Sequence, residues 1–341
     1  TAQLTSPQAA GAQLDAQATV SPFAAWPLSQ LQASTRALDL SALFADAPQT
    51  QIAGEMRIDT QGLDKPIAAN VKLTNAQAGR WDERRLPLTE IELDITGRAD
   101  QRDRLTLRRF ELRAPGDGGR ASGQGEWKGG TATFDITLAA LRPALLDNRA
   151  PAMTLSGTFG SRWLGLPSPD GTASTSNTLQ LQSKLALEGK LGGKLGEAVR
   201  IDAGLQAQRT PESWRIELSD AQARAGAASL RGELQAERGS NGATQLKSQG
   251  QAKGFDPARW WAAAPGARLN GAWNAELQAP PSWRFDAQSV ASWLALRGKA
   301  ELDMQSSTLA GVPLQGTLRA DSAAAGWSID AKASAANNKA S

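Results

Sequence analysis

Apolar and polar residues alternate along much of this chain, and this period of two constrains its fold more than any other feature. Residues 90–97 read EIELDITG, and residues 214–219 read WRIELS. The same pattern occurs at residues 179–182, 302–305 and 327–330. Successive side chains of a β-strand point to opposite faces of its sheet. Each run therefore predicts a strand with one apolar face and one polar face.

Glycine-rich turn signals separate these runs, at residues 116–119, 129–130, 192–193 and 239–242. A parallel sheet covered by helices would read as continuous apolar runs, whereas clean alternation indicates an antiparallel sheet with one solvated face. The sequence thus predicts an all-β chain that is mainly antiparallel.

The alternation slips once, at Arg108 and Arg109 within residues 105–113. Without a correction, this extra polar residue would place Phe110 and Leu112 on the opposite face from Leu105 and Leu107. A β-bulge, which inserts one residue into a strand, returns them to the same face. A break between two strands would explain the slip equally well.

Three segments share an apolar stretch followed by an apolar-x-Gly strand start: residues 38–44 with 52–54, 141–146 with 155–157, and 255–261 with 269–271. Gly54 and Gly157 are 103 positions apart, and Pro143 and Pro257 are 114 positions apart. The strand residues Leu105 and Leu107 precede Ile216 and Leu218 by 111 positions. The pattern predicts a repeat of about 103–114 residues.

We expect one continuous scaffold rather than separate domains: the end of a preceding repeat (1–37), two repeats (38–140 and 141–254) and a partial repeat (255–341). Because proline is well tolerated at the first position of a helix, Pro143 and Pro257 predict one or two helical turns between repeats. Each unit buries its face only by stacking on its neighbours, which favours an elongated object.

Composition excludes several functional classes. With 40% hydrophobic and 21% charged residues, the chain is too apolar for a disordered protein, and no stretch reaches the roughly 18 apolar residues of a membrane-spanning helix. The 37 basic and 34 acidic residues are spread along the chain without a basic cluster, so we expect no nucleic-acid partner.

The chain has no cysteine and no histidine. A thiol nucleophile, a disulfide and the commonest general base and metal ligand are therefore missing. The carboxylate pairs Glu90 with Glu92 and Asp82 with Glu83 are typical of solvated surfaces. We expect no catalytic residues, no metal site, no cofactor and no enzyme activity.

The segments VSPFAAWPL (20–28), LDLSAL (38–43) and PQTQIAG (48–54) resemble the TamB family, the translocation and assembly module component of the AsmA-like superfamily. Looser versions of the pattern occur at residues 138–157 and 252–271. The resemblance covers nearly the whole chain in spacing and residue type.

The resemblance implies an elongated, repeating, U-shaped β-groove, open and mainly antiparallel, with an apolar interior. It also implies a location in the periplasm of a Gram-negative bacterium, with an inner-membrane anchor in a segment not present here, so that this chain would be a middle segment. TamB-like proteins are linked to phospholipid transfer between the inner and outer membranes and to outer-membrane protein assembly with a barrel partner. The expected partners are thus phospholipid acyl chains, the two membranes through other segments, and an outer-membrane barrel protein.

The residues predicted to line the groove are the apolar members of the alternating runs. They are Ile91, Leu93, Ile95, Leu105, Leu107, Phe110, Leu112, Phe134, Ile136, Leu179, Leu181, Trp214, Ile216, Leu218, Leu302 and Met304.

Three other readings of this apolar face remain open. It could be the interior of an ordinary β-sandwich, although many of its positions are small, such as Ala203, Ala207, Ala221, Ala223 and Ala225. The chain could instead be a structural or chaperone-like scaffold for outer-membrane protein assembly, whose open sheet edges accept added strands. A surface adhesin built from β repeats is a third possibility.

Overall fold

The computed structural model of the chain describes residues 2–5, 13–20, 23, 28–60, 62, 65–98, 100–168, 177–192, 196–261, 263–281, 295–323, 326–335 and 338–340. The chain divides into two compact units, residues 1–175 and 176–341. Most of the segment 20–28 that carries the TamB resemblance lies outside the described residues.

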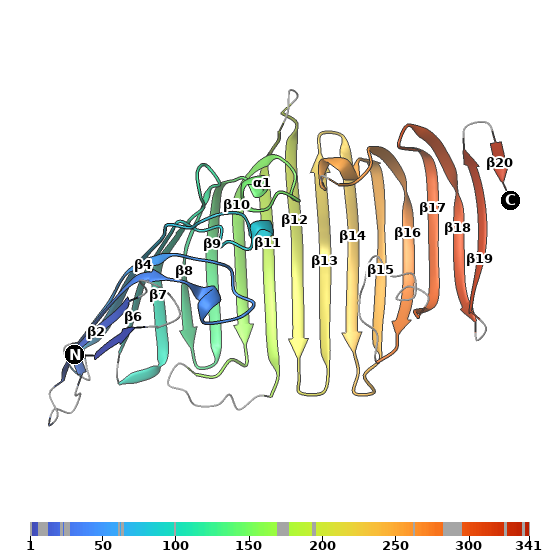
Figure 1. Cartoon of the computed structure of the whole chain (residues 1–341). Helices are drawn as coiled ribbons and strands as arrows, with labels where there is room; N and C mark the ends of the chain where they lie inside the picture. The colour runs from blue at the N-terminus through green and yellow to red at the C-terminus, as the bar shows by residue number, and fades with distance from the viewer. Residues whose placement is uncertain are drawn as a thin grey trace. The chain divides into compact units, whose positions relative to one another are not determined.

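The first unit is a meander in which each strand pairs antiparallel with the next (Figure 1). Its strands are β1 (Ala2–Thr5), β2 (Gln13–Val20), β3 (Leu28–Leu38), β4 (Ile52–Thr60), β5 (Pro66–Asn75), β6 (Glu90–Arg98), β7 (Gln101–Arg113), β8 (Arg120–Lys128), β9 (Thr131–Leu141) and β10 (Met153–Leu164). Its short helices are the single turns η1 (Leu40–Ala42), η2 (Trp81–Glu83) and α1 (Pro143–Leu146).

The second unit continues the same pattern of neighbouring antiparallel strands. Its strands are β11 (Leu179–Leu191), β12 (Ala198–Arg209), β13 (Trp214–Ala225), β14 (Ala228–Arg238), β15 (Thr244–Phe255), β16 (Ala267–Ala279), β17 (Arg297–Leu309), β18 (Val312–Ala323), β19 (Gly326–Ala335) and β20 (Asn338–Ala340), with the helical turn η3 (Pro257–Arg259). The predicted fold class, an open antiparallel β-sheet of the β-groove type with short helical turns, is confirmed.

Of the two explanations for the slip at Arg108 and Arg109, a β-bulge or a strand break, the structure contains the β-bulge. Strand β7 runs unbroken through this point, and its register with β8 shifts between Leu107 and Phe110. Strand β13, 111 positions later, shifts its register with β14 between Leu218 and Ala221, at the equivalent place. Both shifts keep apolar side chains on one face on either side of the bulge, so the break between two strands is ruled out.

The segments that recur in the sequence also share their backbone geometry. Ala37, Ala140 and Gly254 each have a positive φ (52°, 51° and 57°) immediately before the strand ends, and a helical turn follows in each copy. Gly54, Gly157 and Gly271 then have φ values of 157°, 156° and 157°, each within the first five residues of the next strand. The division of the chain into four repeat segments stays a prediction, but these local conformations recur at the predicted spacing.

One aspartate organises the turn in two of the three copies. Asp39 Oδ1 accepts hydrogen bonds from the Ser41 N–H (3.0 Å), which caps η1, and from the Thr50 N–H (3.0 Å), which precedes β4. Asp256 Oδ1 accepts from the N–H groups of Ala258 (3.2 Å) and Ala267 (3.0 Å) in the same way. Each carboxylate thus caps the N-terminus of the helical turn. It also binds an N–H group at the approach to the next strand, so it joins the two segments.

We expect the Asp39→Asn substitution to destabilise the fold in a pH-dependent manner. Burial raises the pKa of Asp39, but hydrogen bonds from Thr50 and Ser41 outweigh it, so the pKa is lowered overall. Because the pKa of Asp39 is lower in the folded than in the unfolded chain, its carboxylate stabilises the folded state at pH values above the unfolded pKa of about 3.9. This stabilisation is lost as the pH falls through the folded pKa. The stability deficit of Asp39→Asn, measured by urea unfolding, should be full at neutral pH and shrink below about pH 4.

The exposed Asp46 supplies the control for this experiment, because Asp46→Asn removes the same charge from the same loop. A deficit of equal size for the two variants, or one that does not change with pH, would contradict the role assigned to Asp39.

Few of the side chains that the structure describes are fully buried. The contacts between elements are almost all between neighbouring strands, and within the described part of the chain no second layer packs against either face. The buried apolar residues are Ile52, Phe110, Ala132, Met153 and Leu155 in the first unit and Leu187, Val199, Ala225, Ala236, Ala279 and Leu296 in the second. A two-layer domain would bury its apolar face against another element, so the sandwich interpretation does not describe these residues.

Candidate functional site

The strand registers bring the apolar residues of the first unit together on one face. Residues directly opposite each other on paired strands lie on the same face of the sheet, so the pairs form rows that cross the strands. One row, from β3 to β10, contains Ala33, Met56, Val71, Leu93, Phe110, Gly123, Ile136 and Phe159. The next contains Leu31, Ile58, Ala69, Ile95, Leu107, Gly125, Phe134 and Ser161.

The other predicted residues of this unit lie on the same face. Ile91 and Leu112 pair in a third row, and Leu105 pairs with Trp127 in a fourth. Phe110 is buried, and the remaining predicted residues of this unit are half-buried. All nine candidates of the first unit therefore share one surface, which we call the apolar face.

The second unit has its own apolar face, built in the same way. One row contains Leu181, Ala207, Ile216, Ala236, Leu246, Leu277 and Gly298. Another contains Ser183, Leu205, Leu218, Leu234, Ser248, Ala275, Ala300, Ala320 and Ile329. Each of the nine successive strands from β11 to β19 thus contributes a small or apolar residue to this row.

The predicted residues Leu302 and Met304 lie on this face too, where they pair with Trp273 and Gly271. Leu179 and Trp214 belong to a row that also contains Arg209 and Arg238. Because arginines enter this row at the strand ends, it marks one margin of the apolar face.

Large apolar side chains of the second unit remain accessible on this face. The exposed fractions of Ile216, Leu234, Leu302 and Leu318 lie between 36% and 39%, and that of Ile329 is 63%. Half-exposed aliphatic side chains that adjoin each other form a contiguous apolar surface, and such surfaces on soluble proteins mark interaction sites.

Sequence reasoning missed Trp273, which is the bulkiest side chain of the second unit's central rows. Its ring occupies the space where the absent side chains of Gly232 and Gly250 would point, and its Nε1–H donates to Ser248 Oγ (3.0 Å). Leu205, Leu234, Leu246 and Leu318 were also missed. The serine, glycine and alanine residues between them weaken the alternation that would have revealed them.

The opposite face of both units is charged, and ion pairs cross between its strands. Lys72 Nζ lies 3.2 Å from Glu92 Oε1, and Arg113 Nε lies 3.2 Å from Glu90 Oε2. In the second unit, Lys247 pairs with Glu276 (3.5 Å) and Arg319 with Glu301 (3.6 Å). Exposed pairs of this kind contribute little stability each, but they keep this face solvated.

Glu111 is the most enclosed carboxylate of the charged face. Arg109 Nη2 lies 2.6 Å from its Oε2 and Arg113 Nη2 lies 3.0 Å from its Oε1. Hydrogen bonds from Arg109 and then Arg113 lower the pKa of Glu111, which is the effect of two guanidinium groups on one carboxylate rather than of a catalytic environment.

The two carboxylate pairs noted in the sequence form ion pairs with neighbouring cations. Glu90 and Glu92 lie on the charged face in the ion pairs given above, and Asp82 and Glu83 of η2 pair with Arg80 at 3.6 and 2.6 Å. No group of three or more metal-ligating side chains occurs among the described residues. None of the helices described is long and apolar enough to span a bilayer.

Comparison with known proteins adds no relative: the chain matches no family model, no curated protein and no solved structure.

Proposed function

We propose that the chain is part of a bridge-like protein of the Gram-negative periplasm whose apolar face carries phospholipid acyl chains between the inner and outer membranes, as a contribution to outer-membrane biogenesis. The observation that supports this most is the set of apolar rows that cross successive strands and stay half-exposed. No catalytic step is part of the proposal.

The size of the apolar face suits an acyl chain. Each methylene group gains about 0.8 kcal/mol when it leaves water for an apolar surface, so a chain must stay in contact along its whole path. Strands are about 4.8 Å apart, so the eight intervals from β11 to β19 correspond to a row of roughly 38 Å. Such a row offers contact to many methylene groups at once, which a single closed pocket does not.

The charged face fits the same proposal, since it would keep a single-layer sheet solvated in an aqueous compartment. Contacts with the two membranes and with an outer-membrane barrel partner would be made by other segments. The alternative function is that of a scaffold for outer-membrane protein assembly that binds strands at its open edges. In that case the apolar face would hold no lipid.

Photo-crosslinking in cells to radiolabelled phospholipid tests the proposal. Photoreactive residues would replace Leu93, Leu107 and Leu218 on the apolar face. Glu92, Thr106 and Glu217, each one position earlier on the opposite face, serve as matched controls. We expect lipid adducts at the first three positions and none at the second three, because the acyl chain contacts only the apolar side.

Adducts at neither set would reject lipid carriage and favour the scaffold. Equal adducts at both sets would indicate non-specific association with membranes and would equally reject a defined path along the apolar face.

A further inference from the structure

The charged face of the second unit contains a basic hollow that the acyl-chain proposal does not use. This hollow has a volume of about 660 Å³ and is lined by residues of β13 to β17. Its charged lining side chains are Arg224, Arg231 and Lys253, and no carboxylate lines it. Arg224, Ser229 and Lys253 are opposite one another on β13, β14 and β15, and Arg231 lies two residues beyond Ser229.

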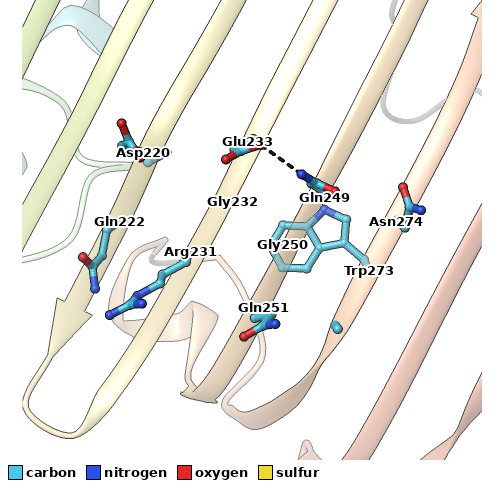
Figure 2. Close-up of a pocket in the computed structure, with 12 residues that line it drawn as sticks. Asp220, Gln222, Arg231, Gly232, Glu233, Gln249, Gly250, Gln251, Trp273 and Asn274 are labelled. Atoms are coloured by element: carbon cyan, nitrogen blue, oxygen red, sulfur yellow. Dashed lines mark hydrogen bonds between the residues drawn. The ribbon is translucent and has the colours of Figure 1, made fainter.

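The two arginines converge on one point. The side-chain amide of Gln222 is oriented so that both its oxygen and its nitrogen face suitable hydrogen-bond partners. In this orientation the oxygen accepts hydrogen bonds from Arg231 Nε (2.9 Å) and Nη2 (3.2 Å). It also accepts from Arg224 Nη2 (2.7 Å) and Nε. Two guanidinium groups are thus held around a neutral acceptor. Figure 2 draws the hollow that adjoins this one and shows Gln222 beside Arg231, with Gln251 nearby.

This arrangement differs from the rest of the face. Neighbouring cations such as Arg200, Lys247 and Arg319 pair with carboxylates at 2.8, 3.5 and 3.6 Å. Among the ion pairs of the described residues, none includes Arg224, Arg231 or Lys253. Asp202 is near enough to Arg224 for the two charges to interact, but Asp202 is already held by Arg200 at 2.8 Å.

A second hollow of about 620 Å³ adjoins the first and shares Arg231, Gln251 and Ala272 with it. Its outer side chains are uncharged amides and the carboxylates Asp220 and Glu233, with Gln249 Nε2 donating to Glu233 Oε2 at 2.9 Å (Figure 2). The positive charge is therefore concentrated at one end of a longer polar surface.

We propose that Arg224, Arg231 and Lys253 form a binding site for a phosphate group. A phosphate oxygen would replace the Gln222 oxygen between the two guanidinium groups, and Lys253 would neutralise a further charge. Charge-assisted hydrogen bonds to an anion are roughly twice as strong as those to a neutral acceptor, and the guanidinium fork matches phosphate geometry. The ligand would also relieve the repulsion between the cations. The site lies on the face opposite the apolar rows, so it does not depend on lipid carriage there.

The phosphate could belong to a soluble phosphate compound or to a lipid headgroup, and two assays on the full chain separate these sources. Inorganic phosphate is titrated by calorimetry at constant ionic strength, and phosphatidylglycerol vesicles are tested by co-sedimentation. We expect the double variant Arg224→Gln with Arg231→Gln to weaken binding at least about tenfold, since each lost charged hydrogen bond is worth about that factor.

The matched control is Lys299→Gln with Arg319→Gln, which removes two charges from the same face where both cations are already paired. Arg231→Lys keeps the positive charge but loses the planar guanidinium group that can donate two parallel hydrogen bonds to a phosphate. It should therefore also weaken phosphate binding. Unfolding midpoints of all variants verify that they fold.

Variant-sensitive binding of free phosphate supports a site for a soluble phosphate compound. Variant-sensitive binding of vesicles alone supports a headgroup site. No binding in either assay, or an equal loss in the double variant and in its control, would overturn the proposal.

Discussion

The Gly271→Ala variant is expected to unfold with a free energy about 3 kcal/mol lower than that of the natural chain. A Cβ at this position would overlap the carbonyl oxygen of Asp303 and lie 3.1 Å from Met304 Cα, both backbone atoms that cannot move aside alone. The residue also has φ 157°, a conformation that side chains rarely adopt. Overpacking and a disfavoured backbone conformation each cost about 1–3 kcal/mol.

Gly266→Ala is the control, five positions earlier in the chain. A Cβ there meets nothing within 4 Å, and the residue does not have a positive φ. Thermal unfolding of the two variants should differ by several degrees, at about 2–4 °C per kcal/mol for units of this size. Equal melting temperatures would show that the strand pair tolerates a side chain at Gly271.

The same result is expected for Gly54→Ala, because Gly54 has the equivalent conformation in the first copy and its Cβ would overlap the carbonyl oxygen of Lys72. Gly160→Ala should be tolerated although Gly160 also lies in a strand. A Cβ at this position would meet only Asp135 Oδ1, at an ordinary contact distance of 3.7 Å.

A pair of charges placed on the apolar face should strongly weaken the lipid binding that we propose for the second unit. Leu218 and Leu234 are directly opposite each other on β13 and β14. The double variant Leu218→Lys with Leu234→Glu forms a cross-strand ion pair, which preserves the fold. It removes contact with roughly four methylene groups of a bound acyl chain, about 3 kcal/mol, or roughly 100-fold in affinity. Phospholipid that co-purifies with the protein, quantified by mass spectrometry, measures the loss.

Glu217→Lys with Gln235→Glu is the matched control, since it creates the same pair on the same two strands but on the charged face. It should leave the lipid content unchanged. If both variants lose lipid, or neither does, the apolar face of the second unit is not the lipid path.

The two-faced sheet follows from the sequence where the alternation is strong. The runs at residues 90–97 and 105–113 became β6 and β7. The slip at Arg108 and Arg109 indicated either a bulge or a strand break, and the register shift between β7 and β8 decided for the bulge. Apolar residues at every second position of one strand must share a face, so Ile91, Leu93 and Ile95 of β6 could be assigned to one surface without knowing the neighbouring strands. The helical turns at Pro143 and Pro257 were predicted for an equally local reason, since proline fits the first position of a helix.

Features that depend on distant parts of the chain were not predictable. The space above Gly232 and Gly250 belongs to Trp273 of β16, and only the registers of β14, β15 and β16 bring the three together. Asp39 and Asp256 are ordinary turn residues in the sequence, and their second bond to the next strand, 11 positions away, appears only once the chain has folded.

The sequence by itself thus determined the strands, their two faces and the spacing of the repeated turns, because these depend on side-chain periodicity and on glycine and proline at particular positions. The tertiary structure alone decided which residues form each row across the sheet, that no layer packs on the apolar face of the described residues, and that Arg224 and Arg231 meet at Gln222. Register between strands is fixed by the sum of many cross-strand contacts, and no local pattern in the chain encodes that sum.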